Sequence, residues 1–214
     1  MLLAQNGAPW FCPVPNGLSW SRPPLVIASG NPHKVAEIQA MLAVVDLEVL
    51  PQPRGLEVEE TGDTYSANAR LKAEAVAAHT GCWALADDSG LEVDALGGRP
   101  GLYSARYAPS DPEKLHRLLH DLGDSLYRSA RYVSAMALAD PAGRTVAEAQ
   151  GLCSGQILRA PQGTGAGYDP LFYVREAGCT YAQMTDAQRT RLGSRGKAAR
   201  LIAPELRHHL GLQS

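Results

Sequence analysis

Short apolar runs alternate with helix-forming segments along the first half of the chain, and this alternation constrains the fold more than any other feature. The runs typical of buried strands are 25–28, 47–50 and 82–86. The segments with helical signals that follow them begin at His33, Thr64 and Asp111. Strand-like residues then span 132–139, 145–151 and 157–158, before a helical end over 185–210. Helices between early strands, followed by a hairpin, predict an α/β fold with a mixed sheet.

Composition sets the scale of the fold and excludes several classes of partner. The chain has 214 residues, of which 45% are hydrophobic and 20% charged, enough for one large domain or two small lobes. A net charge of −2 gives no general attraction to nucleic acid or to an anionic membrane, and no apolar run is long enough to cross a bilayer. We therefore expect neither nucleic acid nor membrane as a partner.

Cysteine spacing and the N-terminal stretch bear on location. The four cysteines are scattered and form no Cys-x-x-Cys pair, which argues against a zinc ribbon and favours a reducing, cytoplasmic setting. Residues 1–24 lack the basic start and the continuous apolar block of a signal peptide. We interpret them as a flexible extension ahead of a single domain over 25–214.

Two adjacent acids, Asp87 and Asp88, come directly after the third apolar run, where a turn needs only one. Their charge has to be balanced by a divalent cation, by a nearby lysine or arginine, or by solvent. Carboxylate oxygens suit Mg²⁺, which commonly takes one or two protein carboxylates together with phosphate and water. An acid here can also accept a proton from an attacking water. The alternative is that both residues only cap a turn after the strand.

The stretch ASGNPHK, residues 28–34, combines a strand end, a glycine-containing loop and a helix start. Unpaired N–H groups at a helix start favour an anion, so the loop is a candidate phosphate site. An ordinary capped turn with a solvated lysine fits the same residues. Farther along, Asn68 and Lys72 stand four residues apart and share one side of a helix. That helix is equally well explained as solvated and charged.

Two later stretches have the composition of ligand sites. The glycine-rich residues 163–172, GTGAGYDPLF, could let the backbone approach a flat ligand, but no helix follows them as in a dinucleotide fold. Arg195 and Lys197 lie near a helix start, where cations suit an anionic partner or simply form a basic surface. Each of these signals is modest when taken alone.

Taken together and in this order, five blocks resemble the ITPase/Ham1 family of purine nucleoside triphosphate pyrophosphatases over nearly all of 25–210. The most specific is ADDSGLEVDALGGRPGLYSARYA, joined by SGNPHKVAEI, EETGDTYSANARLKA, GTGAGYDPLF and GSRGKA. The resemblance implies an elongated mixed β-sheet flanked by helices, in two lobes with the active cleft between them, and a homodimer. It also implies Mg²⁺-dependent hydrolysis of ITP, dITP or XTP to the monophosphate and pyrophosphate, a house-cleaning reaction on the nucleotide pool.

Positions that match the family's motifs acquire roles by this resemblance. The triphosphate would be held by Ser29, Gly30, Asn31 and Lys34. Glu59 and Asp88 would hold Mg²⁺, and the catalytic residues would be Asp88, as base for the attacking water, with Lys34 and Lys72. The further substrate contacts would be Ser89, Ala166, Gly167, Tyr168, Asp169, Arg189, Ser194 and Arg195, with Tyr168 and Asp169 beside the nucleoside and Arg195 at the base.

Most departures from the family pattern fall at positions that the resemblance places near the base of the nucleotide. They are Ala166 in place of phenylalanine, Ser194 in place of histidine, Ala67 in place of glutamate and Arg189 in place of lysine. Loss of an aromatic stack on a base costs on the order of 1–3 kcal/mol, although Trp83 or Tyr173 could substitute. We therefore expect retained pyrophosphatase chemistry with a weakened or shifted base preference. The alternatives are a related nucleotide pyrophosphatase of relaxed specificity and a nucleotide-binding module without turnover.

Overall fold

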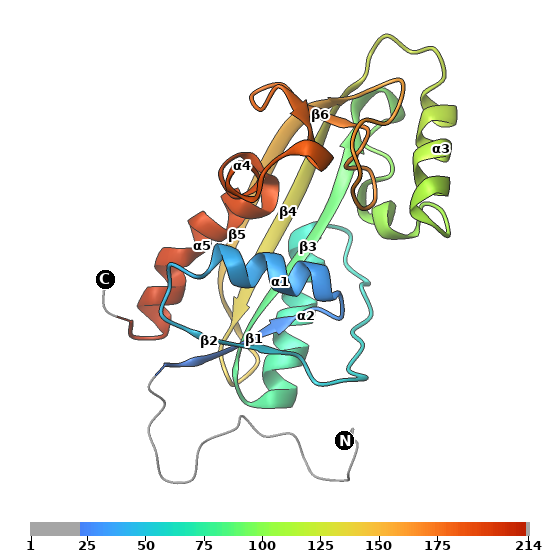
Figure 1. Cartoon of the computed structure of the whole chain (residues 1–214). Helices are drawn as coiled ribbons and strands as arrows, with labels where there is room; N and C mark the ends of the chain where they lie inside the picture. The colour runs from blue at the N-terminus through green and yellow to red at the C-terminus, as the bar shows by residue number, and fades with distance from the viewer. Residues whose placement is uncertain (1–21, 213–214) are drawn as a thin grey trace. The chain divides into compact units, whose positions relative to one another are not determined.

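The computed structural model describes residues 22–212 (Figure 1). Its strands are β1 (Pro24–Ala28), β2 (Glu48–Pro51), β3 (Trp83–Val93), β4 (Ser129–Ala139), β5 (Thr145–Ile157), β6 (Phe172–Val174) and β7 (Cys179–Thr180). Its α-helices are α1 (Pro32–Met41), α2 (Tyr65–Thr80), α3 (Asp111–Leu122), α4 (Asp186–Leu192) and α5 (Ser194–His209). Short 3₁₀ helices are η1 (Asp94–Leu96), η2 (Gly101–Arg106) and η3 (Tyr181–Gln183). The expected flexible extension over 1–24 lies almost entirely outside the described residues.

The strands form one mixed sheet in the order β2–β1–β3–β4–β5–β6–β7. β1 pairs in parallel with β2 and with β3, and Leu25 lies opposite both Val49 and Trp83. Parallel neighbours need crossover connections, which α1 and α2 supply. β6 pairs antiparallel with β5 and with β7. The predicted α/β fold, a mixed sheet flanked by helices, is confirmed.

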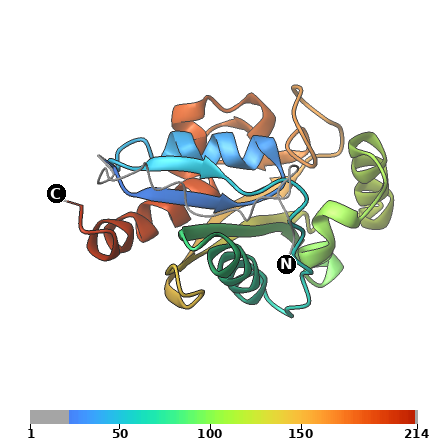
Figure 2. The ribbon, with the colours of Figure 1, turned by 90° about the horizontal axis from the view of Figure 1, so that it is seen from below.

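The chain divides into two compact units, and the first contains residues 22–88, 135–149 and 198–212. Its sheet carries apolar side chains on both faces. Ile27 of β1 packs with Ile38 of α1 and Ile202 of α5 on one face. Its neighbour Val26 packs with Ala73 of α2 on the other, because successive strand residues point to opposite faces. Helices therefore cover this part of the sheet from both sides, and Figure 2 shows α1 and α2 on opposite faces of it.

Alanine fills the interface between α2 and the sheet. Ala69, Ala73 and Ala77 are fully buried against a strand face that is itself largely alanine. Because alanine carries only a methyl group, close packing draws the helix backbone near to the strands. Thr64 caps the first turn by accepting a hydrogen bond from the Ala67 N–H at 3.1 Å. Asn68 and Lys72, in the N-terminal half of the helix, contact Asp88 of β3.

The second unit contains residues 89–134 and 150–197, and its core is aromatic. Phe172 of β6 is fully buried, with its ring centre 4.5 Å from that of Tyr132 on β4 and 6.3 Å from that of Tyr181 in η3. Leu118 and Leu122 of α3 belong to the same core. In the part of the chain that the structure describes, no helix is both long and apolar enough to cross a membrane.

Three predicted boundaries are wrong. β3 does not stop at residue 86 but continues through the acid pair to Val93, because both acids are buried rather than exposed in a turn. Residues 157–158 do not form a separate strand, since β5 itself runs to Ile157. The helical end over 185–210 is interrupted at Gly193, whose extended backbone separates α4 from α5. The short strands β6 and β7 have too few residues to show a pattern, so the sequence does not predict them.

Candidate active site

The two acids lie side by side within β3 and differ in exposure. The side chain of Asp87 is fully buried, whereas 10% of the Asp88 side-chain surface is exposed. A buried carboxylate is costly unless it is paired, and each acid has a lysine. Lys34 Nζ lies 3.1 Å from Asp87 Oδ2, and Lys72 Nζ lies 3.1 Å from Asp88 Oδ1. Among the alternatives that the sequence left open, lysine pairing is what the structure contains.

Lys72, on α2, joins three parts of the site. Its ammonium donates to Asp88 Oδ1, to the Asp87 carbonyl oxygen at 2.9 Å and to Glu60 Oε1 at 2.9 Å. These contacts use all three donors of an ammonium group. Burial lowers the pKa of Lys72, but Asp88 and Glu60 raise it more, so the pKa lies above 10.5 and the side chain is charged at neutral pH. We name Asp87, Asp88, Glu60, Lys34 and Lys72 the carboxylate–lysine cluster.

The loop between β1 and α1 brings Lys34 to this cluster and is itself capped. Asn31 Oδ1 accepts hydrogen bonds from the N–H groups of His33 at 3.0 Å and Lys34 at 3.3 Å, and Ser29 Oγ accepts from the Asn31 N–H at 3.2 Å. The cap therefore satisfies N–H groups that the sequence suggested for a phosphate. Gly30 is exposed, and 26% of the Lys34 side-chain surface is exposed, so an anion can reach both.

Asn68 ties the loop before α2 to Asp88. Its Nδ2 donates to Asp88 Oδ2 at 3.2 Å, its Oδ1 accepts from the Gly62 N–H at 2.8 Å, and the residue is buried. A Cβ on Gly62 would lie 2.7 Å from Asn68 Oδ1 and 2.7 Å from Ala67 Cβ, so only glycine lets the loop dock here. The predicted shared face of Asn68 and Lys72 is real, and it points at Asp88.

The structure brings Glu60, rather than the expected metal ligand Glu59, to the cluster. Glu60 is partly buried at Lys72, whereas Glu59 is exposed. Of these two adjacent acids, only Glu60 is seen in contact with Lys72. The sequence contains no signal that distinguishes them.

The carboxylate–lysine cluster has the chemistry of a divalent cation site. Three carboxylates and two ammonium groups give it a net charge of −1, and carboxylate oxygens are the hard ligands that Mg²⁺ prefers. Within residues 22–212, no group of three Asp, Glu, His or Cys side chains is placed to hold a metal by itself. Since Mg²⁺ commonly completes its shell with water and phosphate, the cluster fits a cation that binds together with a phosphorylated substrate.

In the second unit, each of the first two residues of α5, Ser194 and Arg195, forms a hydrogen bond with a serine. Arg195 Nη2 donates to Ser89 Oγ at 3.0 Å. The hydroxyls of Ser194 and Ser134 lie 2.9 Å apart, and both residues are buried. Ser194, at the position where the resemblance led us to expect histidine, is therefore packed against β4.

The glycine-rich loop over 163–169 is fastened at two points. Gly167, with φ of 56°, donates its N–H to Asp111 Oδ2 at 2.8 Å, at the start of α3. The Tyr168 hydroxyl donates to the Ser104 carbonyl oxygen at 2.9 Å, and Tyr168 is buried. Tyr168 thus anchors the loop, while Ala166 is exposed on it.

Arg189, on α4, and Asp169 form an ion pair beside two tyrosines. Arg189 Nη1 lies 3.6 Å from Asp169 Oδ2, and the guanidinium carbon lies 5.0 Å from the centre of the Tyr181 ring. The Tyr132 hydroxyl donates to Asp169 Oδ1 at 2.9 Å. We name Asp169, Arg189, Tyr132 and Tyr181 the arginine–tyrosine cluster. The sequence motifs pointed to the first two residues, whereas the tyrosines belong to no motif and become visible only through their contacts.

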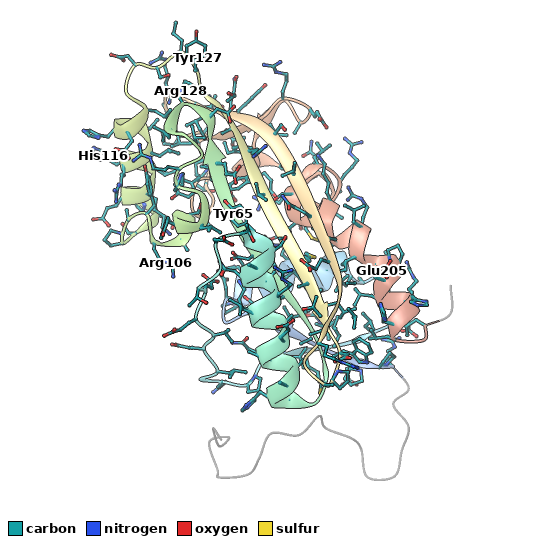
Figure 3. All side chains as sticks on the ribbon, turned by 180° about the vertical axis from the view of Figure 1, so that it is seen from behind. Tyr65, Arg106, His116, Tyr127, Arg128 and Glu205 are labelled. Atoms are coloured by element: carbon teal, nitrogen blue, oxygen red, sulfur yellow. The ribbon has the colours of Figure 1, made fainter. Side chains whose placement is uncertain are left out.

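A separate groove of about 660 Å³ lies in the second unit, between residues 105–109 and α3. Its charged lining residues are Arg106, Glu113, His116 and Arg117, and Figure 3 labels Arg106 and His116. Arg117 is engaged there, since it lies 4.5 Å from the centre of the Tyr107 ring and donates to the Tyr107 carbonyl oxygen. None of the site residues that the resemblance assigned lines this groove.

Comparison with known proteins identifies the relatives of this chain. Residues 25–205 match the model of the Ham1 family. A protein from Synechococcus sp. (strain CC9311), named dITP/XTP pyrophosphatase, is 54% identical over 183 residues, which cover 85% of this chain and 89% of that protein. A protein of the same name from Parasynechococcus marenigrum (strain WH8102) is 50% identical over 190 residues, covering 88% and 97%.

Solved structures agree with these relatives. A HAM1 protein from Coxiella burnetii has a TM-score of 0.79 at 35% sequence identity, covering 87% of this chain and 99% of that chain. The family match includes every predicted site residue, from Ser29 to Arg195. The chain therefore belongs to the Ham1 family.

Proposed function

We propose that this chain is a nucleoside triphosphate pyrophosphatase that hydrolyses dITP, XTP and ITP to the monophosphate and pyrophosphate, and so removes non-standard purine nucleotides from the pool. The carboxylate–lysine cluster carries the proposal, because it combines a hard-oxygen cation site with two ammonium groups. Relatives up to 54% identical are named dITP/XTP pyrophosphatase, which supports the same substrates for this chain.

Asp88 and Glu60 are the residues that we expect to hold Mg²⁺, with Glu60 taking the place that the resemblance gave to Glu59. When bound, the cation supplies Lewis-acid neutralisation of the phosphate oxygens. Lys34, which keeps solvent access, supplies further positive charge to the triphosphate. Lys72 serves chiefly to hold the carboxylates in place, because its donors are already bonded to them and to the backbone.

Asp88 is the group that we expect to accept the proton of the attacking water. Its side chain keeps some exposure, whereas that of Asp87 has none. A carboxylate has about four lone-pair sites on two oxygens. Lys72 and Asn68 take one site on each oxygen, which leaves capacity for a proton. The water oxygen attacks the α-phosphorus while a proton of the water passes to Asp88. The bond between the α-phosphorus and the α–β bridging oxygen breaks, and pyrophosphate leaves.

Selection of the base requires donors that meet the 6-keto oxygen of hypoxanthine or xanthine. Arg189 and Arg195 are the donors that this chain supplies. The 6-amino group of adenine is itself a donor, so it offers no acceptor to the N–H groups that would meet a 6-keto oxygen. Unpaired buried polar groups carry a heavy penalty, which is how such a site discriminates.

Pyrophosphate release from ITP, dITP, XTP, ATP, GTP and dTTP, with and without Mg²⁺, tests the proposal. Wild type is expected to release pyrophosphate fastest from the first three, and only with the metal. Asp88→Asn removes the proton acceptor, so kcat should fall by about 10²–10⁴-fold. Asp124→Asn, which changes a fully exposed acid, is the matched control and should turn over like wild type. Undiminished release by Asp88→Asn would contradict the role given to Asp88.

A related pyrophosphatase with relaxed base specificity is the second candidate, and Ala166 favours it. This alanine is exposed on a fastened loop and has no ring to stack on a base. Trp83, one expected substitute, packs instead against His209 of α5, with ring centres 6.1 Å apart. Similar rates from all six nucleotides would favour this candidate, and binding without release would favour a module without turnover. The expected homodimer and cytoplasmic location stay predictions.

A further inference from the structure

Arg189 is held in one orientation by contacts of three kinds. Its Nη1 pairs with Asp169 Oδ2 at 3.6 Å, its Nε donates to the Met184 carbonyl oxygen at 3.4 Å, and its guanidinium lies over the Tyr181 ring at 5.0 Å. A guanidinium is planar and presents its N–H donors in a rigid fork. Contacts that fix its plane and one of its edges therefore fix the direction of the whole group.

Tyr132 in turn fixes Asp169. Its hydroxyl donates to Asp169 Oδ1 at 2.9 Å, so the two oxygens of this carboxylate have different partners. Burial, together with the nearby Asp169, raises the pKa of Tyr132 well above 10.0, and the hydroxyl stays a donor. The Tyr132 ring packs edge-on against Tyr181, with ring centres 5.4 Å apart. The two tyrosines therefore support each other as well as the ion pair.

Gly193 makes the room that Tyr181 occupies. A Cβ at position 193 would collide with the Tyr181 hydroxyl and would lie 2.5 Å from the Arg189 carbonyl oxygen. Real Cβ atoms do not approach other atoms this closely, so a larger residue at 193 would displace the tyrosine ring. The absence of a side chain at Gly193 thus leaves space for Tyr181, whose ring lies beside the Arg189 guanidinium.

We propose that Tyr132 and Tyr181 are positioning residues for base selection, because they hold Asp169 and Arg189 so that the guanidinium donates to the 6-keto oxygen of a purine. The inference rests on the proposed function, since it concerns the base of the nucleotide to be hydrolysed. About a quarter of the Arg189 side-chain surface, 26%, is exposed, which gives a ligand access to the group.

The contact between Arg189 and Tyr181 depends on the planar shape of the guanidinium. A guanidinium stacks flat on an aromatic ring and meets a carboxylate along one edge, whereas an ammonium is a compact charge without a plane. Lysine at position 189 would keep the positive charge but lose the orientation that Tyr181 and Asp169 impose. If Arg189 acted through charge alone, lysine would serve equally well, and this difference makes the proposal testable.

The test compares kcat and KM for XTP, dITP and ATP in Tyr132→Phe, Tyr181→Leu, Arg189→Lys and the double variant of the last two. Each single change is expected to lower the XTP-over-ATP ratio of kcat/KM by about five- to tenfold. The loss should appear in KM for XTP, with kcat near wild type, because the carboxylate–lysine cluster is unchanged. The double variant should lose no more than either single one, since both remove the same orientation. Tyr181→Phe keeps the ring face and should keep the selectivity.

Tyr107→Phe is the matched control. The Tyr107 hydroxyl donates to Asp121, and Arg117 covers its ring at 4.5 Å, so the substitution makes the same chemical change elsewhere in the second unit. It should lower the thermal unfolding temperature about as much as Tyr132→Phe does and leave the XTP-over-ATP ratio unchanged.

Two failures can be told apart. A wild type that does not prefer XTP and dITP over ATP overturns the proposed function, and the inference with it. A selective wild type whose Arg189→Lys and Tyr181→Leu variants stay equally selective overturns the inference alone. Should Tyr132→Phe fail to fold, the other two variants and Tyr181→Phe still decide the question.

Discussion

At the scale of single residues, the two acids of each adjacent pair differ in their exposure and in the groups that they contact. In β3, Asp87 is fully buried against Lys34, whereas Asp88 keeps some exposure. In the segment before α2, Glu60 contacts Lys72, whereas its neighbour is exposed. Each pair therefore presents one acid side chain, Asp88 or Glu60, to Lys72. Which acid contacts a lysine at this site therefore depends on side-chain direction as well as on residue type.

Glu60→Gln should therefore damage the enzyme and Glu59→Gln should not. Glu60→Gln removes a charge from the proposed cation site and a charged partner from Lys72, so the Mg²⁺ concentration for half-maximal activity should rise by about 10–100-fold. Glu59→Gln changes an exposed carboxylate and should stay within twofold of wild type, about the effect of a neutral surface change. Activity measured across a Mg²⁺ titration decides between them. The reverse order of effects would restore Glu59 as the metal ligand.

Asn68→Ala should lower kcat more than it changes KM. The substitution removes the bonds to Asp88 Oδ2 and to the Gly62 N–H, and two buried partners left unsatisfied cost about 1–3 kcal/mol each. Because Asn68 orients the proposed base rather than the phosphates, the loss falls on the chemical step. Thr80→Ala, which removes a buried hydrogen bond to the Val76 carbonyl oxygen in the same helix, serves as control. It should lower the unfolding temperature and leave kcat unchanged, and an unchanged kcat in Asn68→Ala would refute the orienting role.

At the scale of elements, helix α2 positions the site because it is made of alanine where it meets the sheet. Ala73 is fully buried, and Ala73→Leu forces extra volume into a close-packed interface, at a cost of about 1–3 kcal/mol. The helix should also move outward and carry Lys72 away from Asp88, so activity should fall along with stability. Ala36→Leu makes the same change on the exposed side of α1 and should affect neither. Thermal unfolding and pyrophosphate release, measured on both variants, check this, and full activity in Ala73→Leu would show that helix position does not control the site.

The sequence predicted elements well where hydrophobic pattern and punctuation agree. The Asp-Pro start of α3 and the glycine after α2 fall where expected. It failed for β3, because an acid pair resembles a turn unless the lysines that neutralise it are known. It failed again at Gly193, where the backbone is extended between α4 and α5 and a Cβ would collide with the Tyr181 hydroxyl. Such features arise from long-range contacts, and local periodicity carries no information about them.

At the scale of the whole molecule, each of the two units holds one cluster with its own chemistry. The first unit holds the carboxylate–lysine cluster and the second holds the arginine–tyrosine cluster. Motif order was enough to predict the fold class and the family. It did not predict that Glu60 rather than Glu59 contacts Lys72, or that Tyr132 contacts Asp169, because those contacts follow from side-chain direction and burial. Substitutions in the first cluster should mainly change metal dependence and kcat, and substitutions in the second should mainly change which base is accepted.

Metal binding should be visible in the stability of the whole chain without any turnover. A ligand that binds only the native state stabilises it by RT ln(1 + [L]/Kd), about 2.7 kcal/mol at a hundred times Kd. Since the cluster has a net charge of −1 and fits a cation that binds with phosphate, Mg²⁺ and pyrophosphate together should raise the unfolding temperature more than either alone. Asp88→Asn removes a proposed metal ligand and its negative charge, so it should abolish the extra rise in unfolding temperature that Mg²⁺ and pyrophosphate give together. Asp124→Asn should keep that rise. An equal rise in Asp88→Asn would mean that the cation binds away from β3. The proposed reaction would then not take place at the carboxylate–lysine cluster.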